Sequence, residues 1–154
     1  MYAPASPFSR PIPAGSRALS GMYRQVGVET SVSGATPHEL VKLLLNGFFD
    51  ALTEARGALR DKDVALKGRA LSRATRIVDE GLKAALDTRT GGELATNLND
   101  LYAYVSLRLT HANLRSDEAA LDECVQLMTP IRDAWIAIGP QANAELGMKK
   151  EVLA

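Results

Sequence analysis

Two adjacent glycines are the first feature of this chain that could do chemistry. Gly91 and Gly92 open the segment GGELATNLNDLYAYVSLRL, and free backbone N–H groups at the start of a helix can hold a phosphate. A phosphate loop also needs a preceding strand and a following Lys-Ser or Lys-Thr pair, and the sequence has neither here. The pair therefore predicts a flexible hinge at which one helix ends and the next begins.

The two histidines, His38 and His111, are the candidates for metal binding and for phosphoryl transfer. A di-iron site in a helical bundle needs Glu-x-x-His pairs, and neither histidine has a glutamate three residues before it. We therefore expect no metal and no cofactor. A histidine phosphotransfer bundle remains the alternative function. However, His38 lies in the first turn of its predicted helix, and His111 lacks the lysine and glycine that flank a phospho-acceptor.

Cys124 is the only cysteine, so the chain cannot form an internal disulfide, which fits a reducing compartment. This cysteine shares an apolar helix face with Leu121 and Met128, and no base that could activate its thiol is evident. The pattern predicts a small buried core residue. Because no other catalytic constellation is visible, we expect a protein that is not an enzyme.

The composition limits the class of protein further. The chain has 154 residues, of which 46 % are hydrophobic and 23 % are charged, which suits one globular domain. Its basic and acidic side chains balance to a net charge of zero, so no overall field attracts nucleic acid or an anionic membrane. No apolar run approaches the ~18 residues that suggest a membrane span. We expect neither nucleic-acid binding nor membrane insertion.

The ends of the chain differ in composition from its middle. Residues 1–21 contain four prolines and two arginines but no acidic residue, which predicts a disordered, basic leader. Residues 140–154 begin at the proline of a Gly-Pro pair and predict a loose tail. Residues 36–139 carry the apolar periodicity of helices and are expected to form the folded domain.

Four helical stretches follow one another within residues 36–138. The first begins at TPHE, where Thr36 is a good cap, Pro37 suits the first helical position and Glu39 completes a capping box. It ends at residues 60–63, where Asp61 or Asp63 is expected to cap the second helix.

The second helix is expected to end at residues 87–92, before the third. Ser116 is expected to cap the fourth helix, and Pro130 is expected to bend or restart that helix, with Thr129 as a local cap. Four helices of ~20 residues with short connections predict an all-α protein, an antiparallel up-down four-helix bundle.

The third helix has two apolar sides. One side is expected to face the bundle and carries Leu94, Leu98, Leu101, Val105, Leu109 and Ala112. Ala103, Leu107 and Leu114 lie nearly opposite it, and Tyr104 also points away from the core. Since aromatic residues are enriched at interfaces, this second side predicts a surface that binds another protein.

Five segments, taken in order, resemble the flagellar secretion chaperone FliS family. They are MYRQV, TPHELVKLLLNGFFDALTEA, KGRALSRATRIVDEGLKAALD, GGELATNLNDLYAYVSLRLTHAN and a last helix that ends in RDAW. Within the fourth segment, the family's Gly-Gly-Glu-Leu, Asn-Leu and Leu-Tyr positions fall on residues 91–94, 97–98 and 101–102. The resemblance covers about residues 22–138. The long leader, Pro130, and Leu45-Asn46-Gly47 in place of Leu-Tyr-Asp-Gly depart from the family pattern.

The resemblance implies a cytoplasmic chaperone of type III export, without enzymatic activity. Such a chaperone binds the disordered C-terminal segment of flagellin, prevents premature polymerisation and aids delivery to the cytoplasmic domain of the flagellar export gate. It also implies that residues 22–35 form a cap segment, which covers part of the apolar surface and rearranges when flagellin binds. We expect a monomer.

Seven residues are predicted to belong to the flagellin-binding surface. They are Tyr23, Val26, Leu98, Tyr102, Tyr104, Leu107 and Leu114. Leu98 and Tyr102 also fit ordinary core packing, so both interpretations stay open for them. Tyr104 and Leu107 are the sharper predictions, because their helix positions point away from the core.

Overall fold

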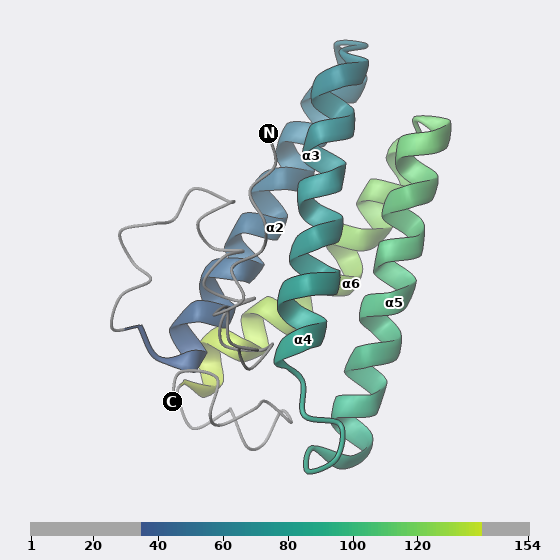
Figure 1. Ribbon diagram of the computed structural model, residues 1–154. Helices are drawn as coiled ribbons and strands as arrows, with labels where there is room; N and C mark the ends of the chain where they lie inside the picture. The colour runs from purple at the N-terminus through teal and green to yellow at the C-terminus, as the bar shows by residue number, and fades with distance from the viewer. Residues whose placement is uncertain (1–34, 140–154) are drawn as a thin grey trace, which may run out of the picture.

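The computed structural model describes residues 35–139, which form a bundle of four helical rods. The elements are α2 (Pro37–Arg60), α3 (Val64–Arg76), η2 (Ile77–Leu82), α4 (Lys83–Ala85), α5 (Gly92–Arg115) and α6 (Glu118–Ile138). α3, η2 and α4 run on without a break and make the second rod. Connections alternate between the two ends of the bundle (Figure 1), so the predicted all-α, antiparallel up-down four-helix bundle is confirmed.

Each rod packs against two others. α2 contacts α3 and α6, and α5 contacts the same two elements from the other side. Mainly leucines and alanines, with a few larger apolar side chains, fill the space between the rods, and Phe48, Leu44 and Leu109 are fully buried. Tight packing of this kind is the main source of stability in a helical bundle.

The predicted starts of the first two helices are confirmed. The Thr36 hydroxyl accepts a hydrogen bond from the Glu39 N–H at 3.1 Å, and the Glu39 carboxylate accepts one from the Thr36 N–H at 3.0 Å. Of the two aspartates considered for the second helix, Asp63 is the cap, because its carboxylate accepts from the Leu66 N–H at 3.0 Å. Both devices satisfy helix N–H groups that have no partner within the helix.

The predicted cap of the fourth helix is wrong by one residue. Asp117 is the cap, since its carboxylate accepts hydrogen bonds from the N–H groups of Ala119 and Ala120. Ser116 instead ends α5, with a φ of 49° in the left-handed region. Serine and aspartate both make good caps, so composition alone did not separate them.

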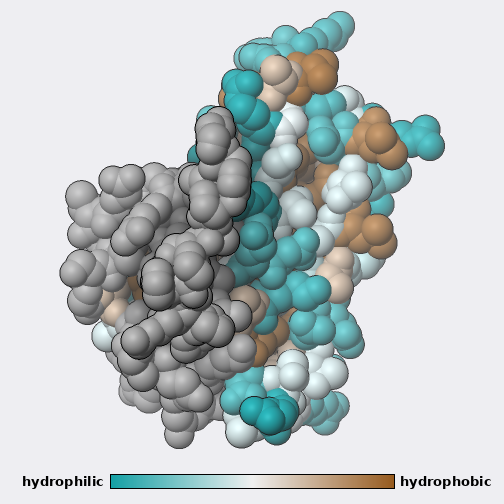
Figure 2. All heavy atoms as spheres, in the orientation of Figure 1, coloured by the Kyte–Doolittle hydropathy of each residue, from teal (hydrophilic) through white to brown (hydrophobic). Residues whose placement is uncertain are grey.

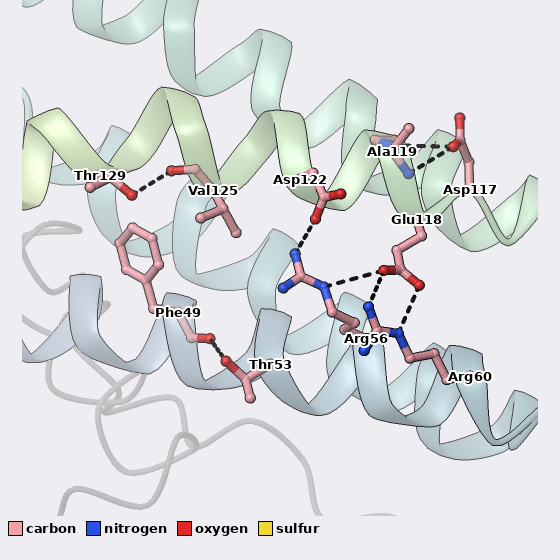
Figure 3. Close-up of polar contacts among 11 residues, drawn as sticks. Phe49, Thr53, Arg56, Arg60, Asp117, Glu118, Ala119, Asp122, Val125 and Thr129 are labelled. Carbon is pink, nitrogen blue, oxygen red and sulfur yellow. Dashed lines mark hydrogen bonds and ion pairs between the residues drawn. The ribbon is translucent and has the colours of Figure 1, made fainter.

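Pro130 does not restart the fourth helix, because α6 runs as one helix from Glu118 to Ile138. Thr129 is not a local cap either. Its hydroxyl donates to the Val125 carbonyl one turn back at 2.6 Å (Figure 3). Threonines in the middle of a helix make this bond, whereas a cap bonds to an N–H group ahead of it. The predicted restart is therefore wrong.

The helix boundary at the two glycines is confirmed. Gly92 has a φ of 60°, a left-handed conformation that glycine adopts without a steric penalty, and α5 begins there. The preceding connection is ordered around Asp87, whose carboxylate accepts bonds from the Thr90 hydroxyl and from the N–H groups of Arg89 and Thr90. The bonds from Thr90 hold the pKa of the Asp87 carboxyl below its usual value.

A wide helical turn interrupts the second rod. The segment η2 is a π-helix, in which each N–H bonds five residues back rather than four. Gly81 lies within it against α2, where an added Cβ would come within 2.8 Å of the Leu44 Cδ1 atom. A larger residue at this position would therefore require the buried Leu44 side chain to shift.

The first and last helices are locked together at one end of the bundle. The Trp135 indole Nε1–H donates to the His38 carbonyl at 2.9 Å, and the His38 Nε2 donates to the Trp135 carbonyl at 2.8 Å. The two rings also stack, with centroids 5.0 Å apart. The Trp135 carbonyl is one of the last four of α6, which have no partner within the helix, so His38 satisfies it.

Ion pairs join α2 and α6 nearer the other end (Figure 3). The Arg60 guanidinium donates two hydrogen bonds to the Glu118 carboxylate, at 3.0 and 2.5 Å, and Arg56 pairs with Asp122. The bonds from Arg60, with the attraction of both arginines, hold the pKa of the Glu118 carboxyl below its ordinary 4.5.

This lowered pKa predicts a loss of stability in acid. The Glu118 carboxylate stabilises the fold above its unfolded pKa, and that contribution disappears as the pH falls through the lower folded pKa. In Glu118→Gln, the free energy of unfolding should be reduced at neutral pH and should converge with that of the original chain once the pH falls below the folded pKa of Glu118. Urea titrations at a series of pH values measure this, with Arg60→Gln as the matched partner variant. A difference that persists unchanged to low pH would contradict the assignment.

Candidate partner-binding surface

The predicted surface residues divide into an exposed set and a buried set. Tyr104, Leu107 and Leu114 are 41, 65 and 78 % exposed, large fractions for apolar side chains on a helix. They recur at spacings of three and seven residues along α5, so they form one line, called here the α5 stripe. In Figure 2 separate apolar patches follow the edge of the molecule formed by α5. Tyr23 and Val26 lie outside the described residues.

Leu98 and Tyr102 are part of the core. They are 8 and 4 % exposed, and burial raises the pKa of the Tyr102 phenol. Leu94, by contrast, is 40 % exposed, so its predicted place on the core side is wrong. It lies in the first turn of α5, next to the fully buried Ala95. The structure therefore brings three of the seven predicted residues together on the surface.

One edge of the α5 stripe is anchored to α6. The Tyr104 hydroxyl donates to one oxygen of the Glu123 carboxylate at 2.6 Å, and the Arg108 Nε donates to the other oxygen at 2.6 Å. These two bonds, that from Tyr104 first, hold the pKa of the Glu123 carboxyl below its usual range. The tyrosine ring is therefore held at the surface in one orientation, which lowers the entropy lost when a partner covers it.

A groove of about 340 Å³ runs between α3 and α5 on the other edge of the stripe. Its walls come from α3 and α5 and consist of Leu71, Ser72, Thr75, Arg76, Leu109, Thr110 and Asn113. Thr110 lies one helical turn from Leu107 and from Leu114, so the groove and the α5 stripe are neighbours. Together they form a surface with apolar anchors on one side and hydroxyl, amide and guanidinium groups on the other.

None of the residues on the α3 wall of this groove belongs to the surface predicted from the sequence. The charged residues of the second helix predict a solvated face, and Arg76 is indeed exposed and pairs with Glu80 at 2.8 Å. What the sequence does not show is that α3 lies beside α5, which places Thr75 and Arg76 next to the stripe. The two hydroxyl residues Ser72 and Thr75, one turn apart beside a charged face, were the available signal.

The two histidines and the cysteine lie in three different surroundings. His38 is 7 % exposed and both its ring and its backbone are engaged by Trp135, so it is not accessible for phosphoryl transfer. His111 lies between Leu107 and Leu114, with its Nε2 3.3 Å from an Asp117 oxygen. Cys124 is fully buried as predicted, and burial raises the pKa of its thiol to about 12, so it carries no thiolate at neutral pH.

Two other kinds of site are not found among residues 35–139. No group of three or more histidine, cysteine, aspartate or glutamate side chains in this part of the chain is arranged to hold a metal ion. None of its helices is both long enough and apolar enough to span a bilayer.

Comparison with known proteins identifies the family. The model of the flagellar protein FliS family matches residues 19–142. The flagellar secretion chaperone FliS of Salmonella typhimurium is 49 % identical over 121 residues, which cover 79 % of this chain and 90 % of the relative. The flagellar secretion chaperones FliSB of Pseudomonas aeruginosa and FliS of Escherichia coli are 41 and 42 % identical, over 75 and 73 % of this chain and 91 and 83 % of theirs. This chain belongs to the FliS family of flagellar proteins.

Proposed function

We propose that this protein is a cytoplasmic chaperone of flagellar type III export that binds the disordered C-terminal segment of flagellin. It covers the apolar face through which that segment would polymerise, and it aids delivery of flagellin to the cytoplasmic domain of the export gate. It acts by binding, without catalysis. The observation that carries the proposal is the α5 stripe, an apolar line on the outside of a fold whose core is already complete.

The geometry of the surface suits a guest that is disordered before it binds. Leu107 and Leu114 lie two helical turns apart, a spacing that matches apolar anchors on a guest helix laid along α5. The groove beside them offers Thr110 and Asn113, whose hydroxyl and amide groups can pair with the backbone of an extended guest. One guest can therefore place a helix on the stripe and extended chain along the groove.

The predicted thermodynamics of binding follow from this geometry. Coupled folding and binding buries about 1,000–3,000 Å² and loses about 2–5 kcal/mol to ordering the guest. Titration of a peptide from the C-terminal end of the cognate flagellin into the full chain should therefore give tight binding with a strongly negative heat-capacity change. Calorimetry at several temperatures measures both quantities.

A peptide of the same composition, with its residues scrambled so that the apolar ones no longer recur at spacings of three, four and seven, is the matched control, because its charge is identical. It should bind at least tenfold more weakly, since the anchors no longer fall at the spacing of the stripe. If the flagellin peptide releases no heat at any temperature while the chain remains helical, the proposal is wrong.

A further inference from the structure

A second hollow lies at the end of the bundle that carries the α2–α3 and α5–α6 connections (Figure 1). It has a volume of about 330 Å³, and the residues that matter for its chemistry are Leu59, Lys62, Asp63, Val64, Lys67 and Ser116. We call it the Lys67 pocket. Neither the family resemblance nor the proposed flagellin surface assigns it a role.

A buried lysine without an acidic partner lines this pocket. Lys67 is 6 % exposed, and its ammonium donates to the Ser116 hydroxyl at 2.7 Å. Within residues 35–139 this is the one hydrogen bond of the ammonium, and no carboxylate oxygen lies within 4.0 Å of it. Lysine is rarely buried without a counter-ion, and an ammonium has three donors. Two donors of a buried cation are therefore available to an anion in the pocket.

The other charged groups at the pocket leave it positive. Lys62 is exposed and contributes a second ammonium at the rim. Asp63 is the acidic residue of the lining, but its carboxylate is engaged as the cap of α3 through the Leu66 N–H. With two cations against one carboxylate that already has a partner, the pocket favours an anionic ligand.

Two backbone conformations support the interpretation that this pocket is a specific binding site. Lys62 and Ser116 have φ values of 59° and 49°, and they are the non-glycine residues with positive φ among those described. Both line the Lys67 pocket. Each ends a helix at a position where glycine is ordinarily preferred, because other residues are strained there. Glycine at either position would remove a polar group, an ammonium or a hydroxyl, from the pocket.

The remaining wall is apolar. Val64 is 71 % exposed, a large fraction for a branched aliphatic side chain, and Leu59 packs against the core behind it. A ligand that reaches the Lys67 ammonium therefore lies against Val64 and Leu59 as well. We infer that the Lys67 pocket binds a peptide carboxylate carried beside an apolar side chain. The carboxylate is either the C-terminal end of a chain or an acidic residue within an apolar segment.

The inference is tested by nuclear magnetic resonance titration of the full-length, 15N-labelled protein with three small probes. N-acetyl-leucine carries a terminal carboxylate, N-acetyl-leucinamide is its neutral counterpart, and N-acetyl-Leu-Glu-amide carries a side-chain carboxylate. Saturable shifts of the Val64, Lys67 and Asp117 amide signals with either acid, but not with the neutral amide, are expected. The first acid reports a terminal carboxylate and the second an acidic side chain.

Lys67→Met removes the ammonium and keeps a long, flexible side chain. It should therefore lower the affinity for whichever acid probe binds, at least about tenfold. Lys42→Met, on the exposed face of α2, is the matched control and should leave the affinity unchanged. Equal binding of the neutral amide, no saturable shift with either acid, or full affinity in Lys67→Met would each overturn the inference.

Discussion

The double substitution Leu107→Asp with Leu114→Asp is expected to weaken binding of the flagellin peptide by about 100-fold or more. Both side chains are mostly exposed in the free protein, so most of their apolar surface is available for a guest to cover. Burying a leucine contributes about 1.5 kcal/mol or more, and two such anchors give about 3 kcal/mol, which corresponds to that factor. Aspartate adds the cost of covering a charge without a partner. The same calorimetric titration measures the loss.

The fold should survive this change, because neither leucine contributes to the core. Aspartate lowers helix propensity by roughly 0.7 kcal/mol at each site, so a modest fall in the unfolding midpoint is expected without loss of helix content. Ile136→Asp, an exposed apolar position on α6 away from the stripe, is the matched control and should bind nearly as tightly as the original chain. Unchanged affinity in the folded double variant would remove the α5 stripe from the proposed site.

Trp135→Ala is expected to have the largest effect on stability, a loss of about 3–5 kcal/mol in the free energy of unfolding. The indole is 2 % exposed, stacks on His38 and donates to the His38 carbonyl, so its removal leaves a cavity and takes away two of the contacts between α2 and α6 at this end of the bundle. A domain of this size has only about 5–15 kcal/mol in total. Trp135 is the only tryptophan, so unfolding in urea should be followed by circular dichroism rather than by fluorescence.

Two further variants keep this prediction testable if the alanine variant does not fold. Trp135→Phe retains an aromatic ring but loses the Nε1–H donor, and it should cost about 1–2 kcal/mol. Ile136→Ala changes the adjacent, exposed position and should cost less than about 0.5 kcal/mol. If Trp135→Ala lowers the free energy of unfolding by less than about 1 kcal/mol, the contact with His38 does not hold the start of α2 against the end of α6.

The parts of the fold that the sequence predicts are those governed by local chemistry. The capping box joins Thr36 and Glu39, which are three residues apart, so whether it forms depends on residues within one helical turn. The order and length of the four rods follow from apolar periodicity in the same way. The cap on the fourth helix was missed because Ser116 and Asp117 compete locally, and the left-handed backbone at Ser116 decides between them.

The candidate site was predicted only in part, because it depends on neighbours distant in sequence. Helical spacing correctly places Leu107 and Leu114 away from the core, since direction around a helix is a local property. It places Tyr102 only at the flank of the core, and its actual depth depends on which rods pack on either side. The α3 wall of the groove and the Lys67 pocket both require knowledge of which rods are adjacent.

The π-helix η2 in the second rod affects how the length of the chain can vary across a protein family. A turn in which each N–H bonds five residues back holds one residue more than a turn of α-helix. Deleting one residue between positions 77 and 82 would therefore restore a regular α-helix and leave the flanking segments facing the same neighbours. A one-residue gap in a sequence alignment at this point would mark the loss of the wide turn, and the bundle on either side would keep its register.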